Sequence, residues 1–212
     1  MSFTSDMVER LSAEISRRLG ERRFLHTKGV AACASKLAEL CEIESKTEAE
    51  IAAYLHDITK EYSHDEQMAL IKKHKIKLDE EDLMSPAVLH SFTAPQVIKS
   101  EFPEFATDKI LSAVRLHTLG SPDMTEFDEI IFLADFIEET RTYPACVKLR
   151  EFVFSNMKKR DAEANIAILH RAVISAIDST ISNLTESNRF VNSKNILTKE
   201  ALLSKIGNNR KD

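Results

Sequence analysis

The sequence is poor in cysteine, glycine, proline and tryptophan. Its 212 residues include 3 Cys, 4 Gly, 5 Pro and no Trp. So few turn-forming residues argue against a β-sandwich or barrel and favour helices. Three cysteines without a CxxC spacing cannot form an evenly paired disulfide framework, which indicates the reducing cytoplasm as the compartment.

The sequence also lacks a targeting segment and an excess of positive charge. Residues 1–23 mix acidic and basic side chains among the apolar ones, which is unlike a signal peptide. No apolar run approaches the ~18–20 residues that cross a membrane. The net charge of −5 argues against a nucleic-acid binder, which usually carries a basic face. We therefore expect a cytoplasmic protein with neither a membrane nor a nucleic-acid partner.

What the sequence does contain is a helical spacing of apolar residues along most of its length. The first such stretch ends at Gly20, which we expect to close the helix in a left-handed conformation. Capping signals mark several later helix starts: Thr47 with Glu50, Ser85-Pro86, Asp108, and Thr125 with Asp128. No period-2 strand pattern or internal repeat is present. The fold class is therefore predicted to be all-α, a compact helical bundle.

One domain accounts for most of the chain. The helical spacing continues to about Glu186, after which the sequence becomes polar. We predict a single helical domain over residues 1–187 and a C-terminal appendage over 188–212, partly helical, with a loose end from Asn208.

Six polar residues interrupt the apolar faces of these predicted helices. They are His26, His56, Asp57, His90, His117 and Asp135. Any one of them alone would be interpreted as a core histidine or an ion-pair partner. Together, and with an adjacent His-Asp pair among them, they favour one cation site, because isolated buried polar groups are costly. The remaining histidines, His64, His74 and His170, are expected at the surface or the edge of the core.

Four sequence segments resemble one protein family. They are RFLHTKGV at residues 23–30, LHDITK at 55–60, LHTLG at 116–120 and FLADFIEETR at 132–141. In this order they resemble the YqeK branch of the HD-domain metal-dependent phosphohydrolases, over about residues 8–185. The segment Thr198–Leu203 does not clearly reproduce the Thr-x-x-Ala-Arg-Asn motif of that branch.

The resemblance implies roles for individual residues. As metal ligands it implies His26, His56, Asp57 and Asp135, with iron as the metal, most readily one ion, with two ions, manganese or another divalent metal as alternatives. Imidazole and carboxylate ligands without thiolate independently suit iron or manganese. The implied catalytic residues are Asp57, His90 and His117, and the two histidines either hold a second metal or bind phosphate. The implied substrate contacts are His26, Asp57, Ile58, Thr59, Lys60, His90, His117, Thr118, Asp135 and Arg141.

The activity implied by the resemblance is the symmetrical hydrolysis of diadenosine tetraphosphate to two ADP by a metal-activated water. Two alternatives stay open: an HD phosphohydrolase acting on another nucleotide (a cyclic dinucleotide, a deoxynucleoside triphosphate or an alarmone), and a non-enzymatic HD signalling module. The expected partners are the dinucleoside polyphosphate substrate and the ADP product. A homodimer is one assembly that the sequence allows.

Overall fold

The protein is all-α, as its apolar spacing predicts. The computed structural model describes residues 3–43 and 45–208, and over these ranges it contains helices and no strand. The α-helices are α1 (Ser5–Arg18), α2 (Glu21–Leu40), α3 (Lys46–Leu55), α4 (His64–His74), α5 (Glu80–Leu83), α6 (Leu89–Glu101), α7 (Asp108–Leu116), α8 (Glu126–Ile137), α9 (Pro144–Asn156), α10 (Ala162–Glu186) and α11 (Ser193–Asn208). Two short 3₁₀ turns, η1 (Pro86–Val88) and η2 (Pro103–Phe105), flank α6.

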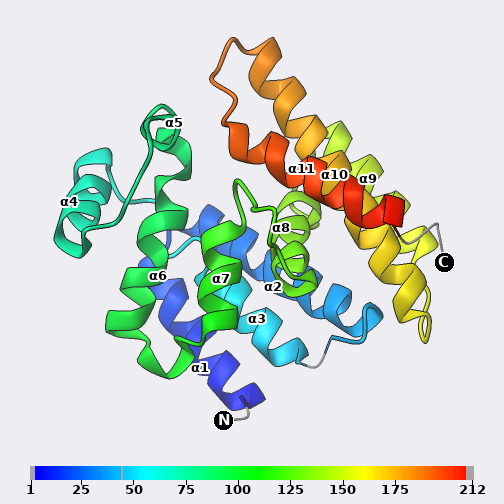
Figure 1. The fold of residues 1–212 in the computed structure, drawn as a ribbon. Helices are drawn as coiled ribbons and strands as arrows, with labels where there is room; N and C mark the ends of the chain where they lie inside the picture. The colour runs from blue at the N-terminus through cyan, green and yellow to red at the C-terminus, as the bar shows by residue number, and fades with distance from the viewer. Residues whose placement is uncertain (1–2, 44, 209–212) are drawn as a thin grey trace.

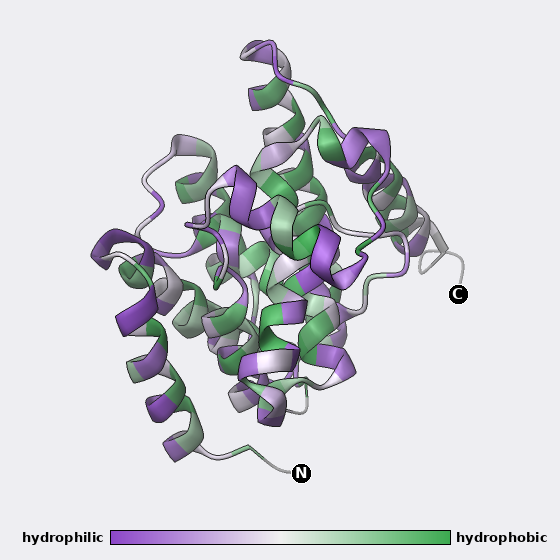
Figure 2. Ribbon diagram, turned by 90° about the vertical axis from the view of Figure 1, so that its left-hand side faces the viewer, coloured by the Kyte–Doolittle hydropathy of each residue, from purple (hydrophilic) through white to green (hydrophobic). Residues whose placement is uncertain are grey.

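Helix α2 lies at the centre of the bundle. It packs against α3 and α8, while α7 packs against α3, α6 and α8, and α10 packs against α8, α9 and α11. Helix α1 and the α10–α11 pair lie on opposite sides of this centre (Figure 1). Hydrophobic residues gather on the inward faces of the helices and hydrophilic ones on the outer faces and connections (Figure 2). Fully buried Leu37, Ile51, Leu55, Ile131 and Leu133 fill the interface between α2, α3 and α8.

The helix starts agree with the sequence in part. Thr125 and Asp128 form the predicted capping box of α8, and Pro86 begins η1 as expected. Helix α3 begins earlier than predicted, at Lys46. Its N-cap is Ser45 and not Thr47, because the side chain of Ser45 accepts a hydrogen bond from the Glu48 amide. Asp108 is the first residue of α7, and Thr107 caps it.

The prediction for Gly20 is wrong. Its φ of −59° is not left-handed, and it precedes α2 as the N-cap, while α1 ends at Arg18 with Leu19 extended. The Gly20 amide donates to Glu61 Oε2 at 2.8 Å, and its carbonyl accepts from Phe24. The chain therefore turns directly from one helix into the next.

The C-terminal helix is tied to the rest of the bundle. Asn195 and Thr198 on α11 donate to the carbonyl of Leu119, each at 3.2 Å. Further along α11, Lys205 donates to the carbonyl of Met124 at 2.7 Å. The predicted loose end lies outside the described residues apart from Asn208, which is the last residue of α11. No described helix has both the length and the hydropathy needed to cross a membrane.

Candidate metal centre

Five helices bring the six predicted polar residues to one place. His26 comes from α2, His56 and Asp57 from the end of α3, His90 from the first turn of α6, His117 from the end of α7 and Asp135 from α8. Three overlapping groups of residues could each hold a metal ion: His26–His56–Asp57, His56–His117–Asp135 and Asp57–His90–His117. Within each group, the three ligand atoms lie within 4.8 Å of one another. Five of the six residues are buried, and the Asp135 side chain is 22% exposed.

The Asp57 carboxylate lies between two pairs of histidines. Its Oδ2 is 3.3 Å from His56 Nε2 and 3.9 Å from His26 Nε2. Its Oδ1 is 3.2 Å from His90 Nε2 and 3.7 Å from His117 Nε2. Burial alone would raise the pKa of Asp57, but His56, His117 and His90 outweigh it and hold that pKa well below its usual value. Asp57 therefore presents an ionised oxygen to each pair.

The histidine tautomers leave the inward ring nitrogens free to bind a cation. Nδ1 of His56 and of His117 lies against the backbone carbonyl of Ala53 and of Val114, respectively. Because a carbonyl can only accept, each Nδ1 carries the proton and each Nε2 keeps its lone pair. The buried Nε2 atoms of His26 and His56 have no hydrogen-bond partner, although Asp135 Oδ1 is 3.0 Å from the former.

This donor set fits a divalent metal. Unpartnered buried nitrogens are costly, and a cation at their meeting point would satisfy them. Burial would raise the pKa of Asp135, but Arg141 and His26 hold it well below its usual value, so this carboxylate is also ionised. Burial lowers the pKa of His26, yet Asp135 and Glu138 outweigh it and raise that pKa to about 9. His26 would have to lose a proton to hold a metal through Nε2, so metal affinity should weaken as the pH falls.

Glu138 fixes the orientation of His26, and sequence reasoning missed it. Its Oε1 accepts from His26 Nδ1 at 3.0 Å, and the Thr140 amide and hydroxyl hold the same carboxylate at 2.7 and 2.6 Å. A Cβ on Gly29 would lie 2.2 Å from Glu138 Oε2, so the close approach of α2 and α8 requires glycine there. The signal was present, because Glu138 follows Asp135 by three residues and shares its helix face.

The carboxylates of Asp57 and Asp135 each contact an arginine guanidinium as well. Arg141 NH2 is 2.6 Å from Asp135 Oδ1, and Arg141 Nε donates to the Asp135 carbonyl at 3.0 Å. Arg23 NH1 is 2.8 Å from Asp57 Oδ2. Sequence reasoning singled out Arg141 but not Arg23, which precedes His26 by three residues on α2 and so shares its side of the helix.

The residues after the His-Asp pair surround His90. Lys60 Nζ lies 3.2 Å from the carbonyl of Ala87 and 3.4 Å from His90 Nδ1, and burial lowers the pKa of Lys60. Ile58 and Thr59 are buried, and the Thr59 hydroxyl donates to the His90 carbonyl at 3.1 Å. Thr118 donates to Ser91 Oγ at 3.1 Å. Lys60 and Thr118 face a cavity, whereas Thr59 supports the helix that carries His90.

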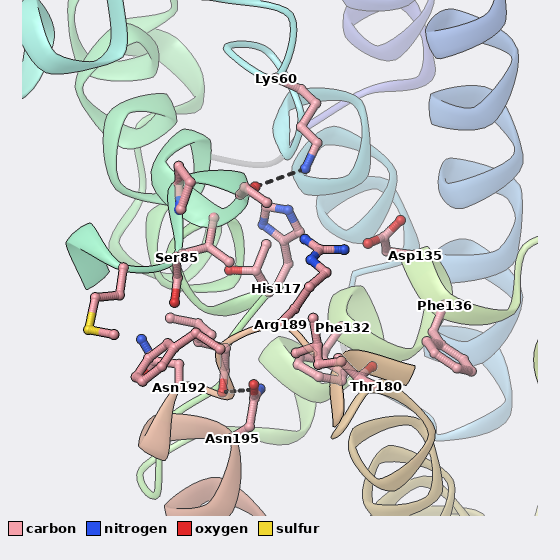
Figure 3. A pocket seen from close by; sticks show the side chains of 18 residues that line it. Lys60, Ser85, His117, Phe132, Asp135, Phe136, Thr180, Arg189, Asn192 and Asn195 are labelled. Carbon is pink, nitrogen blue, oxygen red and sulfur yellow. Dashed lines mark hydrogen bonds between the residues drawn. The ribbon is translucent and has the colours of Figure 1, made fainter. Parts of the chain in front are cut away.

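A cavity of about 500 Å³ opens beside these residues. Thr118 and Phe190 are among the residues that line it. Lys60, His117 and Asp135 lie at its inner end (Figure 3). Its outer part contains Phe132, Phe136, Asn192 and Asn195, and Arg189 points from this part toward His117 and Asp135 (Figure 3). Arg189, Asn192 and Asn195 were not among the predicted substrate contacts, because no motif in the sequence marks the connection between α10 and α11.

A second cavity, of about 360 Å³, lies beside His26. It is lined by Arg22, Arg23, His26, Glu61, Thr140 and Arg141. The first cavity is lined by Asp135 and the second by His26, and these two side chains are 3.0 Å apart. Each cavity is therefore lined by at least one candidate metal ligand.

Of the three histidines predicted at the surface or the edge of the core, two lie where they were expected and one does not. His64 is exposed and His74 is half-buried, as expected. The prediction for His170 is wrong, because this residue is buried and its Nδ1 is 2.7 Å from Glu129 Oε2. All three cysteines are buried, and burial raises the pKa of Cys33 and Cys41 to about 12, so these two thiols pack and are not nucleophiles.

Comparison with known proteins identifies the family. The HD-domain family profile matches residues 23–139, which include all six clustered residues. A protein of Halalkalibacterium halodurans named symmetrical bis(5'-nucleosyl)-tetraphosphatase is 31% identical over 89% of this chain and 93% of its own. A Bacillus subtilis protein of the same name is 32% identical over 92% of this chain and 97% of its own.

The fold is also that of a solved structure. A Clostridium acetobutylicum protein, described as a predicted HD superfamily hydrolase involved in NAD metabolism, superposes with a TM-score of 0.80 at 24% identity. The superposition covers 97% of this chain and all of that one. The matched profile and the two relatives show that the chain belongs to the HD-domain hydrolase family, in the YqeK-like branch of the symmetrical bis(5'-nucleosyl)-tetraphosphatases.

Proposed function

We propose that the protein hydrolyses diadenosine tetraphosphate symmetrically to two ADP. The observation that carries the proposal is a cluster of histidines around two ionised carboxylates, with members that line two cavities, one aromatic and amide-rich, the other cationic. The names of the curated relatives support the same substrate. A ligand with a polyphosphate chain between two nucleosides matches a site that has charge at its middle and room on both sides.

His26, His56, Asp57 and Asp135 would hold the metal, for which we propose one iron ion. When bound, such an ion supplies Lewis-acid chemistry, activating water and neutralising phosphate charge. The water oxygen bonds to a central phosphorus, and the bond from that phosphorus to the central bridging oxygen breaks. The electron pair leaves with the bridging oxygen on one ADP, the other ADP keeps the new oxygen, and the proton lost by the water goes to solvent. Lys60 and Arg141 balance the charge of the phosphates. His90 and His117 bind phosphate as imidazolium, each taking up a proton on binding and donating from Nε2.

The larger cavity would take one nucleoside half. Phe132 and Phe136 offer apolar faces to a base, and Arg189 points toward the end of the cavity where phosphates would lie. Direct substrate contacts by Ile58, Thr59 and Thr118 remain predictions. We further propose that the protein works in the cytoplasm, with the dinucleotide and ADP as its partners and no nucleic acid or membrane.

Product analysis tests this function. The protein loaded with iron or manganese is incubated with diadenosine tetraphosphate, and the products are separated by chromatography. We expect ADP as the sole early product. ATP plus AMP would contradict symmetrical cleavage, and turnover of a cyclic dinucleotide, a deoxynucleoside triphosphate or an alarmone in place of this substrate would favour the alternative hydrolase.

The role of His90 and His117 needs a separate measurement. If His117 binds phosphate, His117→Ala should keep the metal-to-protein ratio of the wild type while ADP affinity falls about ten- to a hundredfold, the range for one charge-assisted hydrogen bond. A lower metal-to-protein ratio would instead assign His90 and His117 to a second metal.

A further inference from the structure

The smaller cavity is lined by more arginines than contact the candidate metal ligands. Three arginines line it, Arg22, Arg23 and Arg141. Arg23 and Arg141 are each bonded to a candidate metal-binding carboxylate. Arg22 is exposed, and within residues 3–43 and 45–208 its side chain makes no hydrogen bond or ion pair. Its guanidinium is therefore available to a ligand.

The one carboxylate that lines this cavity without serving the metal centre is engaged elsewhere. Glu61 Oε2 accepts from the Gly20 amide at 2.8 Å. Thr140 adds a hydroxyl that already donates to Glu138. Among the described residues, no Phe or Tyr lines this cavity, in contrast to the larger one. Its chemistry suits phosphate oxygens and does not suit a nucleobase.

The position of the cavity relates it to the substrate. It reaches the metal centre at His26, whose Nε2 lies 3.0 Å from Oδ1 of Asp135, a residue that lines the larger cavity. A phosphate chain centred on the metal ligands can therefore extend into both cavities. Symmetrical cleavage yields two nucleoside diphosphates, and the larger cavity accommodates one of them.

We infer that the Arg22-lined cavity is the subsite for the departing nucleoside diphosphate, and that Arg22 binds its phosphates. This inference rests on the proposed function. Breaking the bridging P–O bond places a new negative charge on the departing half. A guanidinium positioned beside that half stabilises the charge as it develops, so Arg22 should contribute to the rate as well as to binding.

The test compares three variants with the metal-loaded wild type. Arg22→Ala removes the guanidinium and Arg22→Lys keeps the charge without the bidentate fork. Lys28→Ala is the matched control, because it removes one exposed charge from the same helix and Lys28 lines neither cavity. For each we would measure metal content, kcat/KM for diadenosine tetraphosphate, and the affinity for the first equivalent of ADP by calorimetry.

With Arg22→Ala, we expect kcat/KM to fall about ten- to a hundredfold, the range for one charge-assisted hydrogen bond to phosphate. Arg22→Lys should recover part of the loss, and Lys28→Ala should match the wild type. Metal content and the affinity for the first ADP should be unchanged in all three, because that ADP occupies the larger cavity.

Two results would overturn the inference in different ways. If the wild type releases ADP normally and Arg22→Ala matches it, or if Lys28→Ala loses as much activity as Arg22→Ala, the subsite is wrong and the proposed function stands. If the metal-loaded wild type releases no ADP from diadenosine tetraphosphate, the proposed function fails, and the subsite fails with it.

Discussion

The protein contains two buried clusters of histidine and carboxylate, and they differ in how completely their atoms are paired. The first is the candidate metal centre between α2, α3, α6, α7 and α8. The second joins α8, α10 and α11, where Glu129 accepts from His170 at 2.7 Å through Oε2 and from Lys205 at 3.3 Å through Oε1. Lys205 also donates to the Met124 carbonyl.

In the second cluster every polar atom of the carboxylate has a partner within the chain. Its one carboxylate meets two basic side chains, so the cluster is closed and has no need of a ligand. In the first cluster the buried Nε2 atoms of His26 and His56 have no hydrogen-bond partner, and two ionised carboxylates face them. Burial of a histidine beside a carboxylate therefore does not by itself indicate a metal site. The first cluster differs in combining buried ring nitrogens that have no hydrogen-bond partner with two ionised carboxylates.

Asp57→Ala is expected to have the largest effect. Asp57 contacts both pairs of histidines, so its loss removes a ligand that no neighbouring oxygen replaces. Activity on diadenosine tetraphosphate should fall to background and the metal content should drop, while the circular dichroism spectrum remains that of a helical bundle. Wild-type metal content together with wild-type activity in this variant would contradict the metal assignment.

Glu129→Gln tests the closed cluster. The change leaves His170 and Lys205 without a carboxylate in a buried setting, which should cost about 3 kcal/mol of the free energy of unfolding, the low end for a broken buried pair, because Lys205 is partly exposed. For a chain of this size that corresponds to a fall in Tm of about 6–12 °C. Thermal unfolding gives the stability and metal analysis gives the content. A loss of bound metal without a loss of stability would show that the two clusters were assigned the wrong way round.

Local sequence pattern was sufficient for the helices but not for their exact starts. The segment Ser45-Lys46-Thr47-Glu48-Ala49-Glu50 contains two overlapping capping signals, Ser45 with Glu48 and Thr47 with Glu50. Both satisfy the same spacing, so the pattern cannot choose between them. The structure uses the first. At Gly20, the deciding contact is with Glu61, which lies 41 residues away in sequence and is invisible to local pattern.

For the candidate site too, local sequence pattern was sufficient for some residues and not for others. The six clustered residues stand out in the sequence because each one interrupts the apolar face of its own helix. His170 does so too, yet its partner Glu129 lies 41 residues earlier on another helix, and the neighbouring Arg171 suggested a solvent-facing position. Arg189, Asn192 and Asn195 come from the α10–α11 connection and the start of α11, where no periodic pattern exists to mark them. Only the packing of α11 on α10 brings them to the cavity.

Gly29→Ala sharpens the comparison with the smallest change, one methyl group. The added Cβ would meet Glu138 Oε2 at 2.2 Å, so the Glu138 carboxylate must move and its 3.0 Å contact with His26 Nδ1 is lost. Losing a partner of this kind typically lowers metal affinity about 10–100-fold.

Gly207→Ala is the matched control, because nothing lies within 4 Å of its Cβ and both glycines are helical. Alanine favours a helix over glycine by up to ~1 kcal/mol at either position, so a general effect on helix stability would appear in both variants. Titration against a competing chelator should therefore show weaker metal binding for Gly29→Ala and wild-type binding for Gly207→Ala. Equal affinities in the two variants would mean that His26 holds its orientation without Glu138.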